Sequence, residues 1–191
     1  MNFSRFTVRA GAIVPGICAL LLTGCGTLAN FGSLTTQYAM PPGSETVRLR
    51  VITNGIVRGV PASSCIDWRR EGAGVVAVVH AGFTNLRNQS LGMPTSRRYE
   101  WVPREGFVSS EVLIPANKPF AFHFQSQDMV GGTHRPRCQR SMVFTPEAGQ
   151  DYELLLIESD LCLAQLQSLG DGRNLTGSLQ DTKLCKASDA F

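Results

Sequence analysis

Short segments in which every second residue is apolar limit the fold of this chain more than any other feature. Apolar side chains occupy alternate positions in residues 47–51, and three phenylalanines within 120–124 alternate with Ala121, His123 and Gln125. A period of two is typical of β-strands, because successive side chains point to opposite faces of a sheet. The sequence therefore predicts an all-β fold in which His123 lies on the surface of its strand.

Turn signals divide the chain into about seven or eight short strands. The strongest is Asn54-Gly55, the dipeptide typical of two-residue hairpins. A two-sheet antiparallel sandwich fits this pattern best, and a small closed β-barrel is the alternative. Residues 63–74 and 84–96 are expected to be loops, and residues 161–169 are a weak helix candidate. Strands are expected within residues 47–52, 56–57, 75–79, 112–114, 120–125, 142–144, 152–157 and 161–166.

Composition excludes several classes of protein. Charged residues make up 17% of the 191-residue chain and hydrophobic residues 43%, which excludes a disordered polyelectrolyte. The formal net charge of +3 is too small, at this length, to suggest nucleic-acid binding. No apolar run reaches the roughly 18 residues of a membrane-spanning helix, so a multi-span membrane protein is also excluded.

The N-terminus contains the parts of an export signal in the right order. A basic start with Arg5 and Arg9 precedes an apolar stretch, which runs into Leu22-Thr23-Gly24-Cys25. This tetrapeptide resembles the lipobox of bacterial lipoproteins. In that family the cysteine thiol receives a diacylglyceryl group, a signal peptidase cleaves before the cysteine, and the new amine is acylated. The alternative is an ordinary secretory signal with a chance cysteine.

This resemblance implies an organisation and a location. Residues 1–24 are the signal peptide, and Cys25 carries acyl chains such as palmitate that anchor the protein in a membrane. Gly26 rather than Asp follows the cysteine, which resembles lipoproteins sorted to the outer membrane, so we expect the domain on its periplasmic face. Residues 25–45 are then the lipidated cysteine and a flexible tether, and residues 46–191 are the β-sandwich domain. Phe31 and Tyr38 could equally pack as a first strand.

Four cysteines remain in the exported part of the chain, and an even number predicts disulfide bonds. The sequence contains no C-x-x-C motif, which argues against a zinc site or a thioredoxin-like role. Three connectivities are possible. We favour Cys138–Cys162, because each lies at the outer end of a strand next to one turn, and the remaining pair is then Cys65–Cys185.

No strong motif for catalysis, metal binding or a cofactor is found. Residues 72–77 match a dinucleotide fingerprint, but a β-branched run follows where a helix is needed, so we interpret them as a loop entering a strand. Ser63, Ser64 and Asp67 beside Cys65 could join a distant histidine in a catalytic triad, but a loop held by a disulfide is the simpler interpretation.

Two histidines are the candidates if the protein has a chemical activity. His123 and His134, together with Asp128, could form a metal site, but their spacing is not specific for one. Scattered carboxylates in expected loops offer no pair for glycoside hydrolysis. We therefore assign no catalytic residue, no metal ligand and no cofactor.

A partner-binding site is expected between residues 127 and 137. This segment is longer than a hairpin loop of about 2–5 residues, and Gly131-Gly132 gives its backbone unusual freedom. Arginine binds carboxylates and phosphates, so the partner is an envelope protein or an anionic polymer. The residues expected to contact it are Met129, His134, Arg135 and Arg137.

The leading hypothesis is a lipid-anchored envelope protein that acts as a non-catalytic binding or accessory subunit. Trp68, Tyr99 and Trp101 could belong to an interface or could cap the core. One alternative is an envelope hydrolase that uses His123 or His134. Another is a periplasmic inhibitor of an enzyme such as lysozyme, which is an analogy of fold alone.

Overall fold

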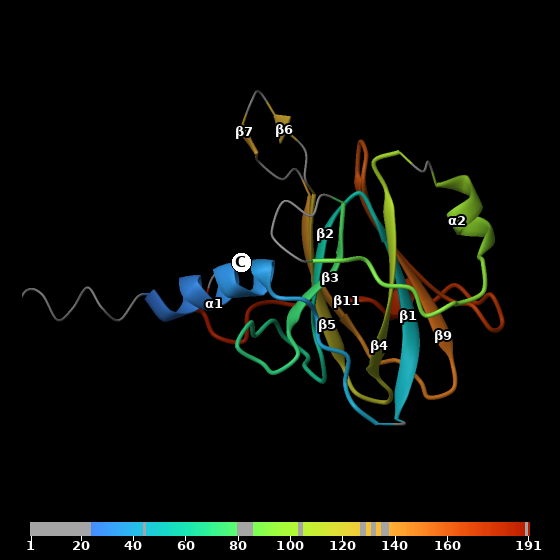
Figure 1. Cartoon of the computed structure of the whole chain (residues 1–191), viewed down its shortest axis with the longest axis horizontal. Helices are drawn as coiled ribbons and strands as arrows, with labels where there is room; N and C mark the ends of the chain where they lie inside the picture. Colours follow the sequence, from blue (N-terminus) through green and yellow to red (C-terminus); the bar gives the residue numbers. More distant parts are fainter. Residues whose placement is uncertain are drawn as a thin grey trace, which may run out of the picture.

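The computed structural model describes residues 24–43, 45–79, 86–102, 105–126, 129–130, 133–134, 138–189 and 191. Nine of the described strands form two open sheets packed face to face, with a short helix at one side (Figure 1). This arrangement confirms the predicted β-sandwich over the single closed sheet that was the alternative. None of the described helices is long and apolar enough to cross a membrane.

The first sheet has four strands in the order β10-β9-β1-β4. β1 runs antiparallel to β4 and parallel to β9, so this sheet is mixed rather than wholly antiparallel as predicted. Residues 161–169, the weak helix candidate, belong largely to strand β10. The strand bounds are β1 Thr46–Thr53, β4 Val108–Pro115, β9 Asp151–Glu158 and β10 Cys162–Ser168.

The second sheet has five strands in the order β11-β8-β5-β2-β3, and all of its pairings are antiparallel. Two further short strands, β6 and β7, pair only with each other. The bounds are β2 Gly55–Val60, β3 Gly74–Val78, β5 Phe120–Ser126, β6 Met129–Val130, β7 Thr133–His134, β8 Gln139–Phe144 and β11 Gln180–Asp181. The short helices are α2 Arg97–Trp101 and the 3₁₀ turn Thr176–Ser178.

The main core lies between the two sheets. The three phenylalanines of β5 face it, as their alternation predicts, and pack against Leu49 and Leu154 of the opposite sheet. Each of these side chains is almost fully buried. Burial on this scale contributes roughly 1.5–3 kcal/mol for each large apolar side chain.

The prediction of a hairpin at Asn54-Gly55 is wrong, because β1 and β2 belong to different sheets. The Asn54 amide instead bridges to β9. Its Nδ2 donates to the Glu158 carbonyl (2.6 Å), and its Oδ1 accepts from the Glu158 N–H (2.9 Å). A Cβ at Gly55 would lie 2.3 Å from the Gln125 carbonyl oxygen, so glycine is needed for the close passage of the chain.

The expectation of a flexible tether after Cys25 does not hold for the described residues. Helix α1 spans Gly24–Thr35, and the segment after it adds to the five-stranded sheet. The Val75 N–H donates to the Thr36 carbonyl, and the Tyr38 N–H donates to the Val75 carbonyl. Tyr38 is buried in the main core, so this part of the chain is fixed to the sandwich.

Both predicted disulfides are confirmed. Cys65 is bonded to Cys185 and Cys138 to Cys162, with Cα–Cα separations of 5.1 and 5.6 Å. The second bond joins the two sheets, because Cys138 precedes β8 and Cys162 begins β10. The first ties the loop after β2 to the C-terminal segment. A disulfide contributes about 2–4 kcal/mol to stability.

Candidate functional site

The outer face of the five-stranded sheet carries a buried polar cluster. Arg58 of β2 and His123 of β5 are cross-strand neighbours that point away from the main core. They are nevertheless only 1% and 2% exposed. The expectation that His123 is a surface residue is therefore wrong. The alternation identified the correct face of the strand, but that face is covered.

Three segments provide the cover. α1 contributes Ala29, the loop after β2 contributes Ile66 and Trp68, and the C-terminal segment contributes Leu184. These residues form a second apolar cluster over the sheet. The bond between Cys65 and Cys185 links two of the three segments, which fits the interpretation of residues 63–67 as a disulfide-held loop.

Arg58 makes its contacts through one end of its guanidinium. Nη1 donates to the Asn30 Oδ1 (2.6 Å) and the Ser33 Oγ (2.8 Å), both on α1. The guanidinium carbon lies 4.0 Å from the Trp68 ring centre, a cation–π geometry. Nε and Nη2 are buried without a hydrogen-bond partner. Burial lowers the pKa of Arg58 to about 10, so the group is still charged at neutral pH.

His123 lies between two aromatic rings. Its Nδ1 is 2.8 Å from the Ser141 Oγ, the Phe191 ring stacks on it at 4.8 Å, and the Trp68 ring is 6.2 Å away. Burial, helped by the positive charge of Arg58, lowers the pKa of His123 to about 3. A general base works best with a pKa near the working pH and must reach its substrate, so this geometry does not support hydrolysis through His123.

The outer face of the four-stranded sheet carries a different cluster around Arg50. Its Nε and Nη2 both donate to the Glu111 Oε1 (3.0 and 2.7 Å), and its Nη1 donates to the Glu153 Oε2 (3.2 Å). The Glu111 Oε2 accepts from the backbone N–H of Leu91 (2.6 Å) and Met93 (3.2 Å). This cluster fastens the segment around residues 90–93 to the sheet.

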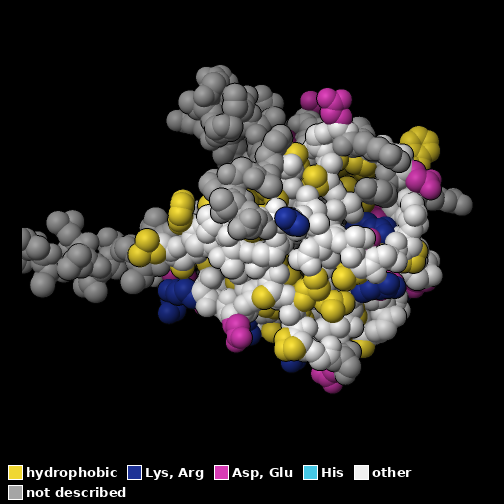
Figure 2. Space-filling model, in the orientation of Figure 1, with side chains coloured by type: hydrophobic (Ala, Val, Ile, Leu, Met, Phe, Trp, Pro, Cys, Tyr) yellow, Lys and Arg dark blue, Asp and Glu magenta, His cyan; other side chains and the backbone are white. Residues whose placement is uncertain are grey.

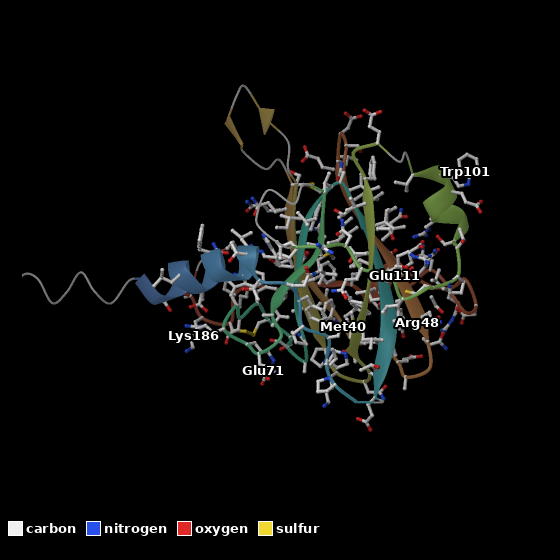
Figure 3. The ribbon with its side chains drawn as sticks, viewed as in Figure 1. Met40, Arg48, Glu71, Trp101, Glu111 and Lys186 are labelled. Carbon is white, nitrogen blue, oxygen red and sulfur yellow. A yellow bond between two sulfur atoms is a disulfide. The ribbon has the colours of Figure 1, made fainter. Side chains whose placement is uncertain are left out.

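The environment of Glu111 keeps it ionised. Burial raises its pKa, but the hydrogen bonds from Arg50 and from the Met93 and Leu91 backbone, together with the Arg50 charge, outweigh burial and leave the pKa below its ordinary value. Figure 3 shows Glu111 and Arg48 on neighbouring strands of this sheet. No local sequence pattern predicts this cluster, because Arg50, Glu111 and Glu153 lie far apart in the chain.

A cleft of about 610 Å³ opens at one end of the sandwich. It lies between residues 39–46, which follow α1, and the loop after β2. Figure 3 shows Met40 and Glu71, which line it, in the lower half of the molecule. Its apolar lining comes mainly from prolines and its charged groups have both signs. The lining includes Met40, Pro41, Pro42, Glu45, Pro61, Arg70, Glu71, Pro115 and Lys118.

The backbone at this cleft is held in uncommon conformations. Ala62 has φ 49° and Gly72 has φ 83°. A left-handed conformation costs a residue with a Cβ about 1–2 kcal/mol, so the loop at Ala62 is fixed by its surroundings. The Arg70 Nε donates to the Pro61 carbonyl (2.7 Å) and closes this loop. The backbone that forms this wall of the cleft is therefore held in one conformation.

The predicted partner site between residues 127 and 137 lies largely outside the described residues. The backbone of Met129 and of His134 pairs across β6 and β7. The side chains of these two residues, and Asp128, Arg135 and Arg137 altogether, are not described. Among the side chains that the structure does describe, no group of three or more metal-ligating residues is found.

The aromatic residues near the loops divide into two kinds. Trp68 is buried and caps the second apolar cluster, whereas Trp101 at the end of α2 is exposed (Figure 3). The glycine motif at 72–74 leads into β3, as expected. The chain matches no protein-family model and shows no detectable sequence similarity to a curated protein.

Proposed function

We propose that this protein is a lipid-anchored protein of the bacterial outer membrane whose domain is a non-catalytic binding or accessory module. The observation that carries the proposal is the position of α1, which includes Cys25 and packs on the sandwich while exposing Leu28 and Phe31 (72% and 61%). An apolar surface next to an acylated cysteine fits a membrane interface.

Helix α1 gives this anchor a fixed geometry. Leu28 and Phe31 are three residues apart and lie on the same side of the helix, and Figure 2 shows apolar side chains exposed along α1. Asn30 and Ser33 turn to the sandwich and bind Arg58. The acyl chains and the exposed apolar side chains would thus enter the membrane together, and the domain would rest on it in one orientation.

The cleft is the best candidate for the binding role. It combines an apolar proline-rich lining with Glu45 and Glu71 of one sign and Arg70 and Lys118 of the other. A cleft of mixed charge fits a polypeptide segment better than a polyanion, which requires one sign of charge. The partner we propose is therefore another envelope protein.

Cys25→Ser tests the anchor. The serine hydroxyl cannot form the thioether, so we expect the variant to lose metabolic labelling by a palmitate analogue and to leave the membrane fraction. Equal labelling of the variant and the unchanged protein would contradict the lipid anchor.

A fluorophore on α1 tests the orientation. Leu28→Cys and the equally exposed Leu161→Cys provide matched single labelling sites, because the domain cysteines are paired in disulfides. On reconstitution into lipid vesicles, we expect a blue shift of an environment-sensitive dye at residue 28 and none at residue 161. The same emission at both positions would contradict the proposed orientation.

Charge reversal in the cleft tests the binding role. We expect Lys118→Glu, which leaves the bond between Arg70 and Pro61 in place, to remove specific crosslinked partners from intact cells, compared by mass spectrometry. Arg173→Glu, on an exposed turn outside the cleft, is the matched control and should keep them. An unchanged set of partners in the Lys118→Glu variant would show that the cleft is not the binding site.

A further inference from the structure

One edge of the buried Arg58 guanidinium has no hydrogen-bond partner. Nε and Nη2 of an arginine form one edge with two parallel donors, which matches the two oxygens of a carboxylate. Arg48 of this chain uses that edge to bind both carboxylate oxygens of Asp151. In Arg58 the same two atoms are buried and have no acceptor.

The neighbouring imidazole presents a further unpaired group. The Nε2 of His123 is also buried without a partner, while its Nδ1 is engaged by Ser141. Arg58 and His123 are directly opposite each other on β2 and β5, and Trp68 lies against both. When the Ser141 hydroxyl donates to Nδ1, the imidazole proton is on Nε2 and Nε2 is a donor. Buried donors without acceptors lose their hydration, so an anionic oxygen ligand would be favourable here.

Phe191 covers this cluster. Its ring stacks on His123 with an interplanar angle of 17°, and its backbone oxygen accepts from the Asn30 Nδ2. The Oδ1 of the same Asn30 binds Arg58, so one amide touches both the cover and the cation. Figure 1 shows the end of the chain lying against α1.

The covering segment is weakly held beyond its disulfide. Residues 186–191 follow Cys185, and the Asp189 carboxylate binds Arg69 at 2.6 Å. The Phe191 side chain is 44% exposed despite its stacking. In the described residues this segment is held by an ion pair that is open to solvent on the arginine side (36% against 5% for Asp189), one ring contact and one hydrogen bond, so few contacts oppose its displacement.

We propose that Phe191 is a built-in occupant of a binding site for an aromatic carboxylate, formed by Arg58, His123 and Trp68. The ring of the external ligand takes the place of the Phe191 ring on His123. Its carboxylate takes the free edge of Arg58 and the Nε2 of His123, so Phe191 is displaced. The site shares no lining residue with the cleft, and it does not depend on the lipid anchor.

N-acetylphenylalanine is the probe, because it carries the ring and the carboxylate together. The chain has two tryptophans, so Trp101→Phe leaves Trp68 as the reporter. In full-length protein in detergent that carries Trp101→Phe and Phe191→Ala, we expect saturable quenching of Trp68 fluorescence. Affinity should be about tenfold higher than with Phe191 in place, which is roughly 1.4 kcal/mol of competition.

Two ligand controls separate the ring from the charge. N-acetylphenylalaninamide lacks the carboxylate and acetate lacks the ring, and each should bind at least about tenfold more weakly than the acid. Arg58→Lys keeps the charge but removes the two-donor edge, so it should abolish the preference for the acid over the amide. Leu161→Ala, an exposed apolar truncation elsewhere, should change nothing.

Two results would overturn the proposal. One is equal affinity for acid and amide, and the other is the absence of saturable binding in the folded Phe191→Ala protein. The Trp101→Phe protein with Phe191 intact gives the same acid-against-amide test at higher ligand concentration. If Phe191→Ala does not fold, equal affinity for acid and amide in the Trp101→Phe protein overturns the proposal.

Discussion

Two buried arginines, one on the outer face of each sheet, are held in opposite ways. Arg50 meets the carboxylates of Glu111 and Glu153, and every one of its guanidinium nitrogens has an acceptor. Arg58 contacts an amide, a hydroxyl and an indole ring, and two of its guanidinium nitrogens have no hydrogen-bond acceptor.

The difference separates a structural cluster from a candidate for binding. A fully satisfied buried network fixes the elements around it and leaves nothing for a ligand to bind. A buried cation with open donors is costly for the fold alone, so its presence calls for another explanation. The comparison predicts that the two arginines differ sharply in their contributions to stability.

Arg50→Met should show the largest effect. It leaves the carboxylates of Glu111 and Glu153 buried without their cation, so we expect the free energy of unfolding to fall by about 3–5 kcal/mol. Urea denaturation followed by circular dichroism measures this. A loss below 1 kcal/mol would contradict the view that this cluster fastens the loop to the sheet.

Removing the bond between residues 65 and 185 should cost somewhat less. We expect the Cys65→Ala, Cys185→Ala double variant to lose about 2–4 kcal/mol, because the unfolded chain is no longer constrained. The cover over Arg58 should loosen as well, so acrylamide should quench Trp68 more strongly. Removing the Cys138–Cys162 bond is the control. If acrylamide quenching of Trp68 rises equally in that variant, the bond between residues 65 and 185 has no specific role in holding the cover.

Acid should weaken the two faces at different pH. The pKa of His123 is 6.5 in the unfolded chain and about 3 in the folded protein, so between these values only the unfolded chain is protonated there. The free energy of unfolding therefore falls as the pH drops through this range, by up to about 1.4 kcal/mol per pH unit. Glu111 has a lowered pKa, so its contribution is present above its ordinary pKa of 4.5 and is lost only below it. Between pH 6.5 and 5, of these two groups only His123 should therefore lower the free energy of unfolding.

His123→Gln checks this separation. Urea denaturation of the variant between pH 6.5 and 5 should show a shallower decline of stability than the unchanged protein. Glu111→Gln should keep the original slope in that range. Identical slopes for the His123→Gln protein and the unchanged protein would mean that the folded state protonates His123 as readily as the unfolded chain does.

Arg58→Met should show the smallest effect. It gives up three hydrogen bonds, all from Nη1, and the contact with Trp68, but it relieves an uncompensated buried charge, so we expect a loss of about 1 kcal/mol or less. The same urea experiment as for Arg50→Met gives a direct comparison. Equal losses for the two arginines would assign Arg58 to the fold rather than to a ligand.

The sequence predicted what depends on local pattern. The phenylalanine alternation located β5 and its core face, and the spacing of strands and turns led to the correct disulfide pairing. The hairpin predicted from the dipeptide at 54–55 was wrong, because a turn signal shows where the chain changes direction but not whether the strands on either side share a sheet. Here the chain crosses from one sheet to the other.

The candidate sites depended on contacts between distant segments. Periodicity placed Arg58 and His123 on the outer face, but their burial comes from α1 and from a segment joined through Cys185, which no local pattern connects to them. Helix α1 has no strong amphipathic period, and its docking depends on single polar contacts from Asn30 and Ser33. Such contacts require three-dimensional information.

The position of β1 within its sheet constrains the order in which the protein assembles. β1 lies between β4 and β9, yet residues that pair across these contacts are 61 and 103 positions away in the chain. During synthesis β1 therefore remains unpaired until β4 has been made, and its second edge remains open until β9 follows. Long-range pairing of this kind slows folding and leaves strand edges open to aggregation. A chain that stops before β9 leaves one edge of β1, a central strand of its sheet, without a pairing strand.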